Sequence, residues 1–367
     1  MQSPLATRYM ATLLFAGSTF LATGQTNLNL SLPRTPSPAA SVSQTIGISN
    51  VSVKYSRPSV KGREVWGTLV PYGWNIQGFG LGNSAPWRAG ANENTVLHLS
   101  DPATIEGHQV PAGDYGLFFV INKDNTGEMI LSKEYRSWGS FFYDPKYDEM
   151  RANITLKPAP FTELLTYDFQ NVTKNSVELD LNWEKMQFPV KIEFDVDKIV
   201  IDNAAQELTS TAGFNWQGYA NAANYVLTNK LTGDYDQAIK WSDQAIAMNS
   251  NFADLSIKSD LLKEMGKTAE ADAMKKDAVA IGNEVELNNY GYQLLNQKEQ
   301  DRAIEVFILN TQRHPRSANC FDSLGEAYAL KGDKKEAIIN FKKSLALNPP
   351  AATKANSEKY LKQLGAM

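Results

Sequence analysis

The chain has 367 residues, of which 43% are hydrophobic and 10% aromatic, so it is long enough for two or three domains that each bury a core. Its formal net charge is -4, and its Lys and Arg residues form no dense cluster. Because nucleic-acid binding depends on a continuous basic surface, the composition argues against DNA or RNA as a partner.

The first predicted element is an export signal. Residues 10–22, MATLLFAGSTFLA, form an apolar run that is too short to span a bilayer, and small residues lie three and one positions before Gln25. A membrane anchor or an amphipathic start is the alternative interpretation. We expect a signal peptide at 1–24, an exported protein that is periplasmic or envelope-associated, and no transmembrane span after cleavage.

The single cysteine, Cys320, lies far from the predicted cleavage site. The sequence therefore provides neither a lipid-attachment cysteine after the signal nor an intrachain disulfide. Export without disulfides points to the bacterial envelope. Residues 25–44 are rich in Pro, Ser, Thr and Asn, and this composition predicts a spacer.

Residues 45–200 are predicted to form a β-domain. Hydrophobic and polar residues alternate in short segments such as 177–183 and 190–194, which is typical of strands with one buried face. Turn-forming residues separate these segments, as in Pro-Ala-Gly-Asp at 111–114. Many short strands at this spacing favour an antiparallel β-sandwich or a flattened barrel.

Beyond residue 200 the composition and the helical periodicity predict an α-helical solenoid of tetratricopeptide repeats, after a linker or first helix at 201–216. Two segments carry the same residue types at the same offsets 34 residues apart, including Gly291 and Gly325, and this is the period of that repeat. The predicted repeats span about 217–251, 252–283, 284–317 and 318–351, followed by a cap helix near 354–364.

The sequence lacks the motifs of common metal and cofactor sites. Its histidines, His98, His108 and His314, have no metal-ligand spacing, and there is no HExxH, CxxC, P-loop or G-x-S-x-G motif. His98 is better explained as a sheet residue that faces a polar neighbour. The glycines of 78–82 predict a flexible loop, and 122–128 predicts a hairpin turn rather than a calcium loop. We expect neither a metal nor a cofactor.

A polar and aromatic set around residues 86–95, PWRAGANENT, is the candidate site of the β-domain. Tryptophan faces with Arg, Asn and Glu suit a sugar or an anionic small molecule, and loops at one end of a sandwich commonly build such sites. In the alternative, structural interpretation, Arg88 pairs with Glu93, Asn92 takes a left-handed conformation and the tryptophans fill the end of the sandwich. The ligand-binding candidates are Arg57, Lys61, Arg63, Trp87, Arg88, Asn92 and Glu93.

The region carries the motifs SRPSVKGREVWG at 56–67, LVPYG at 69–73, WRAGANENT at 87–95, PAGDY at 111–115 and Trp138-Gly139. Together they resemble domain-of-unknown-function family 2911 over about residues 35–196. The resemblance implies an exported bacterial envelope domain, sometimes followed by tetratricopeptide repeats, and it implies no activity. The family's Pro-Tyr-Gly segment runs almost directly into Trp-Arg, whereas here WNIQGFGLGNSAP at 74–86 intervenes, which we expect to cover the site as a lid or to obstruct it.

The first functional hypothesis is a non-enzymatic envelope protein that binds and scaffolds other molecules. Stacked helical hairpins form a concave groove that suits a protein or peptide partner, although ordinary solvated polar faces explain the same residues. The β-domain then packs or binds a small ligand. The groove candidates are Asn288, Asn289, Tyr292, Asn319, Asp322 and Glu326.

The alternative hypothesis is a carbohydrate-binding or hydrolytic β-domain with a site around Trp87, Arg88, Asn92 and Glu93. Glu93 is the one candidate general acid or base, since a carboxylate near tryptophans is easily desolvated. The motif contains no second carboxylate to complete a glycosidase pair. The sequence therefore leaves the catalytic residues unknown and favours binding over catalysis.

Overall fold

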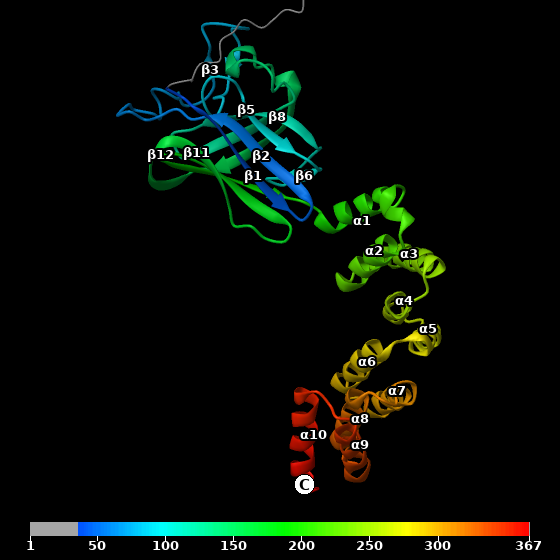
Figure 1. The fold of residues 1–367 in the computed structure, drawn as a ribbon. Helices are drawn as coiled ribbons and strands as arrows, with labels where there is room; N and C mark the ends of the chain where they lie inside the picture. Colours follow the sequence, from blue (N-terminus) through cyan, green and yellow to red (C-terminus); the bar gives the residue numbers. More distant parts are fainter. Residues whose placement is uncertain (1–35, 367) are drawn as a thin grey trace, which may run out of the picture.

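The computed structural model describes residues 36–366, so the predicted signal peptide at 1–24 lies outside the described residues. A β-domain is followed by a curved array of helices (Figure 1). Within the described range no helix is long and apolar enough to cross a membrane.

The larger sheet of the β-domain has six antiparallel strands in the order β1-β2-β5-β8-β9-β10. Its edge strand starts at Ala39, inside the segment predicted as a spacer, and pairs with β2 from Ala39 opposite Ser56. The alternation there is weak in the sequence because the inward-facing positions of this strand include the small Ala40 and the polar Gln44 beside Val42. The strands are β1 Ala39–Ile46, β2 Ser49–Ser56, β5 Thr95–Leu99, β8 Gly113–Ile121, β9 Thr126–Ser132 and β10 Asp148–Thr155.

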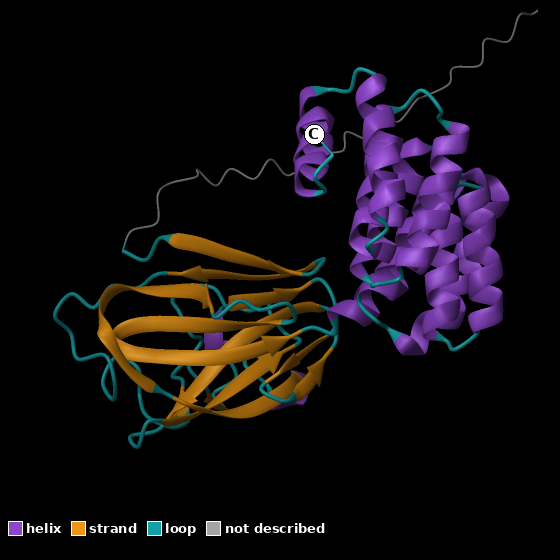
Figure 2. Ribbon diagram, turned by 90° about the horizontal axis from the view of Figure 1, so that it is seen from below, coloured by secondary structure: helices purple, strands orange, loops and turns teal. Residues whose placement is uncertain are grey.

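The smaller sheet packs against the larger one and closes the core. Its order is β11-β12-β6-β7, with β11 Lys157–Gln170, β12 Ser176–Glu193, β6 Ala103–Ile105 and β7 His108–Val110. Figure 2 shows the strands as stacked layers, and the described strands do not close into a barrel. The β-sandwich prediction is therefore confirmed.

The insertion at 74–86 forms a second small core on the outer face of the larger sheet. It contains the hairpin β3 Asn75–Ile76 and β4 Ser84–Ala85, and it meets the 3₁₀ helices η1 Gly139–Phe142 and η2 Pro145–Tyr147. The amide of Leu81 donates to the carbonyl of Phe141 at 3.0 Å. This cover explains why β8 is apolar on both faces: Phe118 and Val120 pack outward under the insertion while their neighbours point into the sandwich.

The predicted turn at 122–128 joins β8 to β9, as expected for a hairpin. The side chain of Asp124 accepts hydrogen bonds from the amide of Thr126, at 3.1 Å, and from its hydroxyl. His98 lies in β5, and its Nδ1 is 2.8 Å from the carboxylate of Asp114, so it is the sheet residue with a polar neighbour that the sequence predicted.

The helical domain is an array of antiparallel helix pairs, and the predicted tetratricopeptide solenoid is confirmed. In the middle of the array the first helix of each pair lies on the inner side of the arc and the second on the outer side (Figure 1). Short 3₁₀ turns, η3 Thr211–Phe214 and η4 Thr232–Asp234, occur near the start of the array. The helices are α1 Val196–Glu207, α2 Trp216–Thr228, α3 Tyr235–Met248, α4 Phe252–Glu264, α5 Thr268–Ile281, α6 Glu284–Asn296, α7 Gln300–Arg313, α8 Ala318–Lys331, α9 Lys334–Ala346 and α10 Ala351–Gln363.

Candidate functional site

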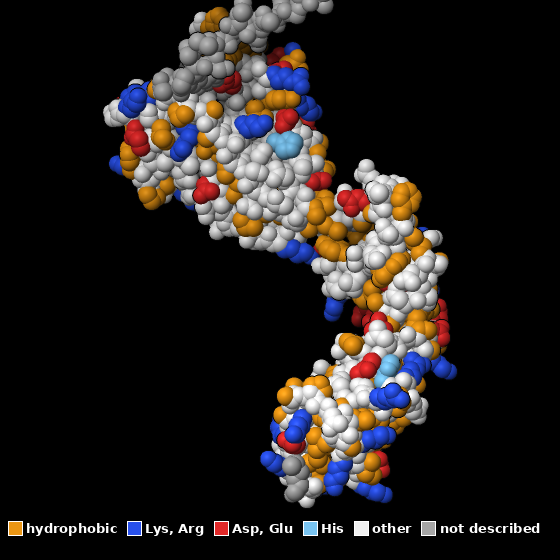
Figure 3. Space-filling model, in the orientation of Figure 1, with side chains coloured by type: hydrophobic (Ala, Val, Ile, Leu, Met, Phe, Trp, Pro, Cys, Tyr) orange, Lys and Arg blue, Asp and Glu red, His pale blue; other side chains and the backbone are white. Residues whose placement is uncertain are grey.

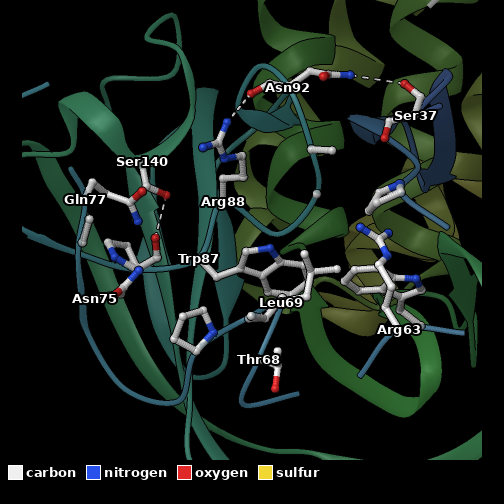
Figure 4. Close-up of a pocket in the computed structure, with 18 of the residues that line it drawn as sticks. Ser37, Arg63, Thr68, Leu69, Asn75, Gln77, Trp87, Arg88, Asn92 and Ser140 are labelled. Carbon is white, nitrogen blue, oxygen red and sulfur yellow. Dashed lines mark hydrogen bonds between the residues drawn. The ribbon is translucent and has the colours of Figure 1, made fainter. Parts of the chain in front are cut away.

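A cavity of about 700 Å³ lies at the end of the sandwich where the insertion folds. Figure 4 shows side chains from distant parts of the chain around it: Arg63, Thr68 and Leu69 on one side, Asn75 and Gln77 of the insertion on the other, and Trp87 between them. The insertion therefore supplies part of the wall rather than filling the space. A volume in this range matches sites for small molecules.

The loop that carries Trp87 is held in one conformation by its own residues. Ala89 and Asn92 have left-handed φ values of 52° and 62°, and a Cβ on Gly90 would lie 2.7 Å from Oγ1 of Thr95, so the chain turns sharply. The left-handed Asn92 of the structural interpretation is thus observed. Before the turn, Trp87 exchanges two backbone hydrogen bonds with Phe119 of β8, at 2.8 and 2.9 Å.

Arg88 fixes one wall of the cavity through its guanidinium. Its Nη1 donates to the carbonyl of Asn92 at 2.6 Å, and the guanidinium lies 5.0 Å from the ring centroid of Phe141. A Cβ on Gly139, which has φ of 60°, would lie 2.2 Å from the guanidinium, so only glycine allows this approach. Burial lowers the pKa of Arg88 from its ordinary value.

An aromatic cluster forms the base of the loop. The ring of Trp87 stacks on that of Trp183 with centroids 5.9 Å apart and an interplanar angle of 16°, and Trp66 meets both rings edge-on at 5.9 and 5.7 Å. Phe188 packs against Trp87 at 6.1 Å. The tryptophans therefore do fill the end of the sandwich, as the structural interpretation held, but half-buried Trp87 also lines the cavity.

Lys61 and Arg63 line the cavity from an exposed loop. The guanidinium of Arg63 donates from Nε to the carbonyl of Val60 at 3.1 Å and from Nη2 to the carbonyl of Ser59. These two bonds hold the head group in place and leave Nη1 without a partner among the described residues.

Arg57 and Glu93, two of the predicted ligand-binding residues, lie elsewhere. Arg57 donates to the carbonyl of Leu165 at 2.9 Å and to the hydroxyl of Thr166 at 2.6 Å, so it ties β2 to β11 across the two sheets. Glu93 lines a separate depression beside Lys54 rather than the cavity. Arg88 and Asn92 line the cavity whereas Glu93, the next residue after Asn92, lines the other depression.

Trp183 is one of the cavity residues that the sequence did not single out. It lies on β12 and is 1% exposed, and it resembles any inward-facing aromatic residue in a pattern of alternating strand residues. Only the pairing of β12 within its sheet places it next to the 86–95 loop.

The candidate groove residues fall into two groups on the first helices. Asn289 and Asn319 are exposed, and Asn288 is half-buried. Tyr292, Glu326 and Asp322 are instead bonded within the array. The hydroxyl of Tyr292 donates to Glu326 at 3.1 Å.

The cap helix α10 occupies the groove face of the last repeat. Asn356 of α10 donates to the carboxylate of Asp322 at 2.8 Å, and Ser357 donates to the other oxygen of the same carboxylate. Tyr360 donates to Glu326 at 3.1 Å. Asp322 and Glu326 are thus contacts between the last repeat and its cap, and burial raises the pKa of Asp322.

These features define a two-domain protein: a β-sandwich with a cavity at one end, followed by a tetratricopeptide array. Residues 37–192 match the family model "Protein of unknown function (DUF2911)", and residues 318–350 match the model of a tetratricopeptide repeat. The chain therefore carries a DUF2911 domain followed by tetratricopeptide repeats. No curated protein matches the chain.

Similar solved structures are repeat proteins. One is YrrB, described as a TPR protein with an unusual peptide-binding site, at 18% identity and a TM-score of 0.28, covering 44% of this chain and 84% of that one. PilF of Pseudomonas aeruginosa is 21% identical with a TM-score of 0.29, covering 42% and 71%. A repeat protein of Cytophaga hutchinsonii is 18% identical with a TM-score of 0.30, covering 46% and 72%. Likeness at this level carries no functional argument.

Proposed function

We propose that the protein is an exported bacterial envelope scaffold whose repeats bind a protein or peptide partner. The supporting observation is the inner face of the array, where the first helices place polar side chains at equivalent positions 34 residues apart: Asp254, Asn288 and Asp322, followed by Asn356 of α10. Such concave faces are the binding surfaces of repeat proteins.

The groove is open in its middle part and closed at its end. At the last repeat the polar position is bonded to α10, whereas Oδ1 of Asn288 and Oδ1 of Asp254, which are both buried, have no hydrogen-bond partner among the described residues. Exposed Asn289 and Asn319 flank this part. The partner is therefore expected to lie along α6 and α8, where the exposed amides of Asn289 and Asn319 can form hydrogen bonds.

Photo-crosslinking tests this proposal. A photoreactive side chain at Asn289 or Asn319 should give one discrete crosslinked product in an envelope extract, and the identified partner should then bind the purified protein. Glu305 and Lys342, which are exposed on the outer helices α7 and α9, are matched control positions. Equal products from both faces, or none from the groove, would show that the groove does not bind a partner.

A second function, small-molecule binding by the β-domain, is favoured by the 700 Å³ cavity. Binding is favoured over hydrolysis because Glu93, the candidate acid or base, lines a different depression. A saturable rise in the melting temperature with a ligand, lost in Trp87→Ala, would support binding. A shift of the same size in the variant would place the ligand elsewhere.

A further inference from the structure

The charged side chains that line the cavity are all of one sign, although the Glu163 carboxylate accepts a hydrogen bond from the backbone amide of Lys61 at 3.0 Å. The described lining of the cavity contains Lys61, Arg63 and Arg88 but no Asp, Glu or His. On the molecular surface, by contrast, acidic and basic side chains are interspersed (Figure 3), and the chain as a whole carries a net charge of -4. The positive lining is therefore a local feature of this cavity and not a consequence of composition.

Two of these cations keep donors that are free to bind a ligand. The ammonium group of Lys61 has no partner among the described residues, and Arg63 has Nη1 free while its other nitrogens are held by backbone carbonyls. A guanidinium that is already oriented loses less side-chain entropy when it binds an anion. Figure 4 shows Arg63 and Arg88 on different sides of Trp87.

The cavity wall also contains a buried donor without an acceptor. Trp183 is 1% exposed, and its Nε1 has no hydrogen-bond partner in the part of the chain that the structure describes. Because this nitrogen is itself buried, a bound molecule reaches it only if the surrounding rings move. It can donate to an acceptor of any charge, so it does not by itself favour an anion over a neutral ligand.

We propose that the cavity binds a small organic anion, in which one or more carboxylate or phosphate groups are attached to a sugar or another ring-bearing body. The anionic group is bound by Lys61 and Arg63 at the exposed side, and the body lies against Trp87. The inference rests on the proposed small-molecule function of the β-domain and specifies its ligand class.

Matched pairs of compounds that differ in the anionic group test the proposal. One pair is N-acetylmuramic acid and N-acetylglucosamine, and the other is glucose 6-phosphate and glucose; together they separate carboxylate from phosphate. Calorimetric titration of the full chain should show saturable binding of at least one acid, at least about tenfold tighter than its neutral partner. Added salt should weaken binding of the acid.

Variants assign the binding to the cavity. Lys61→Gln/Arg63→Gln should weaken binding of the acid by at least about tenfold, and Lys61→Gln alone should act in the same direction without loss of the Arg63 backbone contacts. Lys54→Gln/Lys191→Gln removes the same charge from positions outside the cavity and should leave the affinity unchanged.

The outcomes separate the inference from the function on which it rests. Equal binding of acid and neutral compound, or binding of the acid that survives Lys61→Gln/Arg63→Gln, would overturn the anion assignment and leave small-molecule binding in place. If no member of either pair binds at millimolar concentration, both the anion assignment and the small-molecule function fail.

Discussion

Gly291→Ala is expected to destabilise the third repeat because α6 and α7 pack closely at this position. A Cβ on Gly291 would lie 2.5 Å from two carbons of the Phe307 ring, whereas carbon atoms in favourable contact are about 3.5 Å apart. The ring must therefore retreat by roughly 1 Å. Phe307 is fully buried in the core cluster of this repeat, and Tyr292 packs edge-on against it with centroids 5.4 Å apart, so the ring can move only by displacing its neighbours.

The expected cost follows from two opposing effects. Overpacking a core costs about 1 to 3 kcal/mol, while replacing a helical Gly by Ala returns about 0.5 to 1 kcal/mol of helix propensity. We expect a net loss of about 1 to 2 kcal/mol in the free energy of opening of α6 and α7, measured by native-state hydrogen exchange. Gly325→Ala, where Phe341 is 2.9 Å away, should cost less.

Two further variants decide whether the contact is the cause. Gly233→Ala is the control, since no atom lies within 4 Å of the new Cβ and its φ is not positive. Phe307→Leu combined with Gly291→Ala should cost less than the sum of the single changes because the smaller side chain relieves the clash. The reasoning is refuted if the free energy of opening of α6 and α7 is the same in Gly291→Ala as in the wild type. It is also refuted if Gly325→Ala lowers stability more than Gly291→Ala does.

Two predictions concern buried carboxylates. Burial, aided by the neighbouring Glu178 carboxylate, raises the pKa of Asp180 from 3.8 to about 6, so the stability from its protonated form is present below about pH 4 and is lost as the pH rises through about 6. Asp180→Asn keeps an acceptor for Gln187, and near neutral pH its free energy of unfolding should exceed that of the wild type by up to about 3 kcal/mol. A difference in melting temperature between the two proteins that does not change with pH would contradict this. Asp322→Ala leaves Asn356 and Ser357 of α10 unpaired and should speed hydrogen exchange in α10 by an amount equivalent to about 1 to 3 kcal/mol, while equal acceleration in α2 would indicate global unfolding instead.

The fold was predictable because its determinants are periodic in the sequence. The spacing of 34 residues that relates Gly291 to Gly325 exists because each glycine lies against the ring of the following helix, Phe307 or Phe341. Repeated packing requires repeated residue types, so the array can be read without knowledge of the structure. The start of β1 was not predicted because the inward face of this edge strand is only weakly apolar, so its sequence shows no clear alternation of apolar and polar residues.

The site was only partly predictable because proximity across strands leaves no trace in residue spacing. Lys61, Arg63, Trp87, Arg88 and Asn92 all line the cavity, since they come from two loops at the same end of the sandwich. Their loops alone could not show that Trp183 lines the cavity or that Arg57 and Glu93 lie outside it. Their roles depend on strand register and on the turn at Asn92, which sequence neighbours do not determine.

The boundary between the domains falls inside a helix that belongs to both cores. Val196 of α1 is buried in the core of the β-domain, with Ile199 and Val200 packed against it, while Ile201 and Ala204 pack against the core of the first repeat. The change of composition near residue 200 therefore lies in the middle of α1 and not in a linker without contacts. Removal of α1 would therefore expose apolar surface on both domains, and the two are joined by a packed helix that continues directly from β12, the strand that carries Trp183 into the cavity wall.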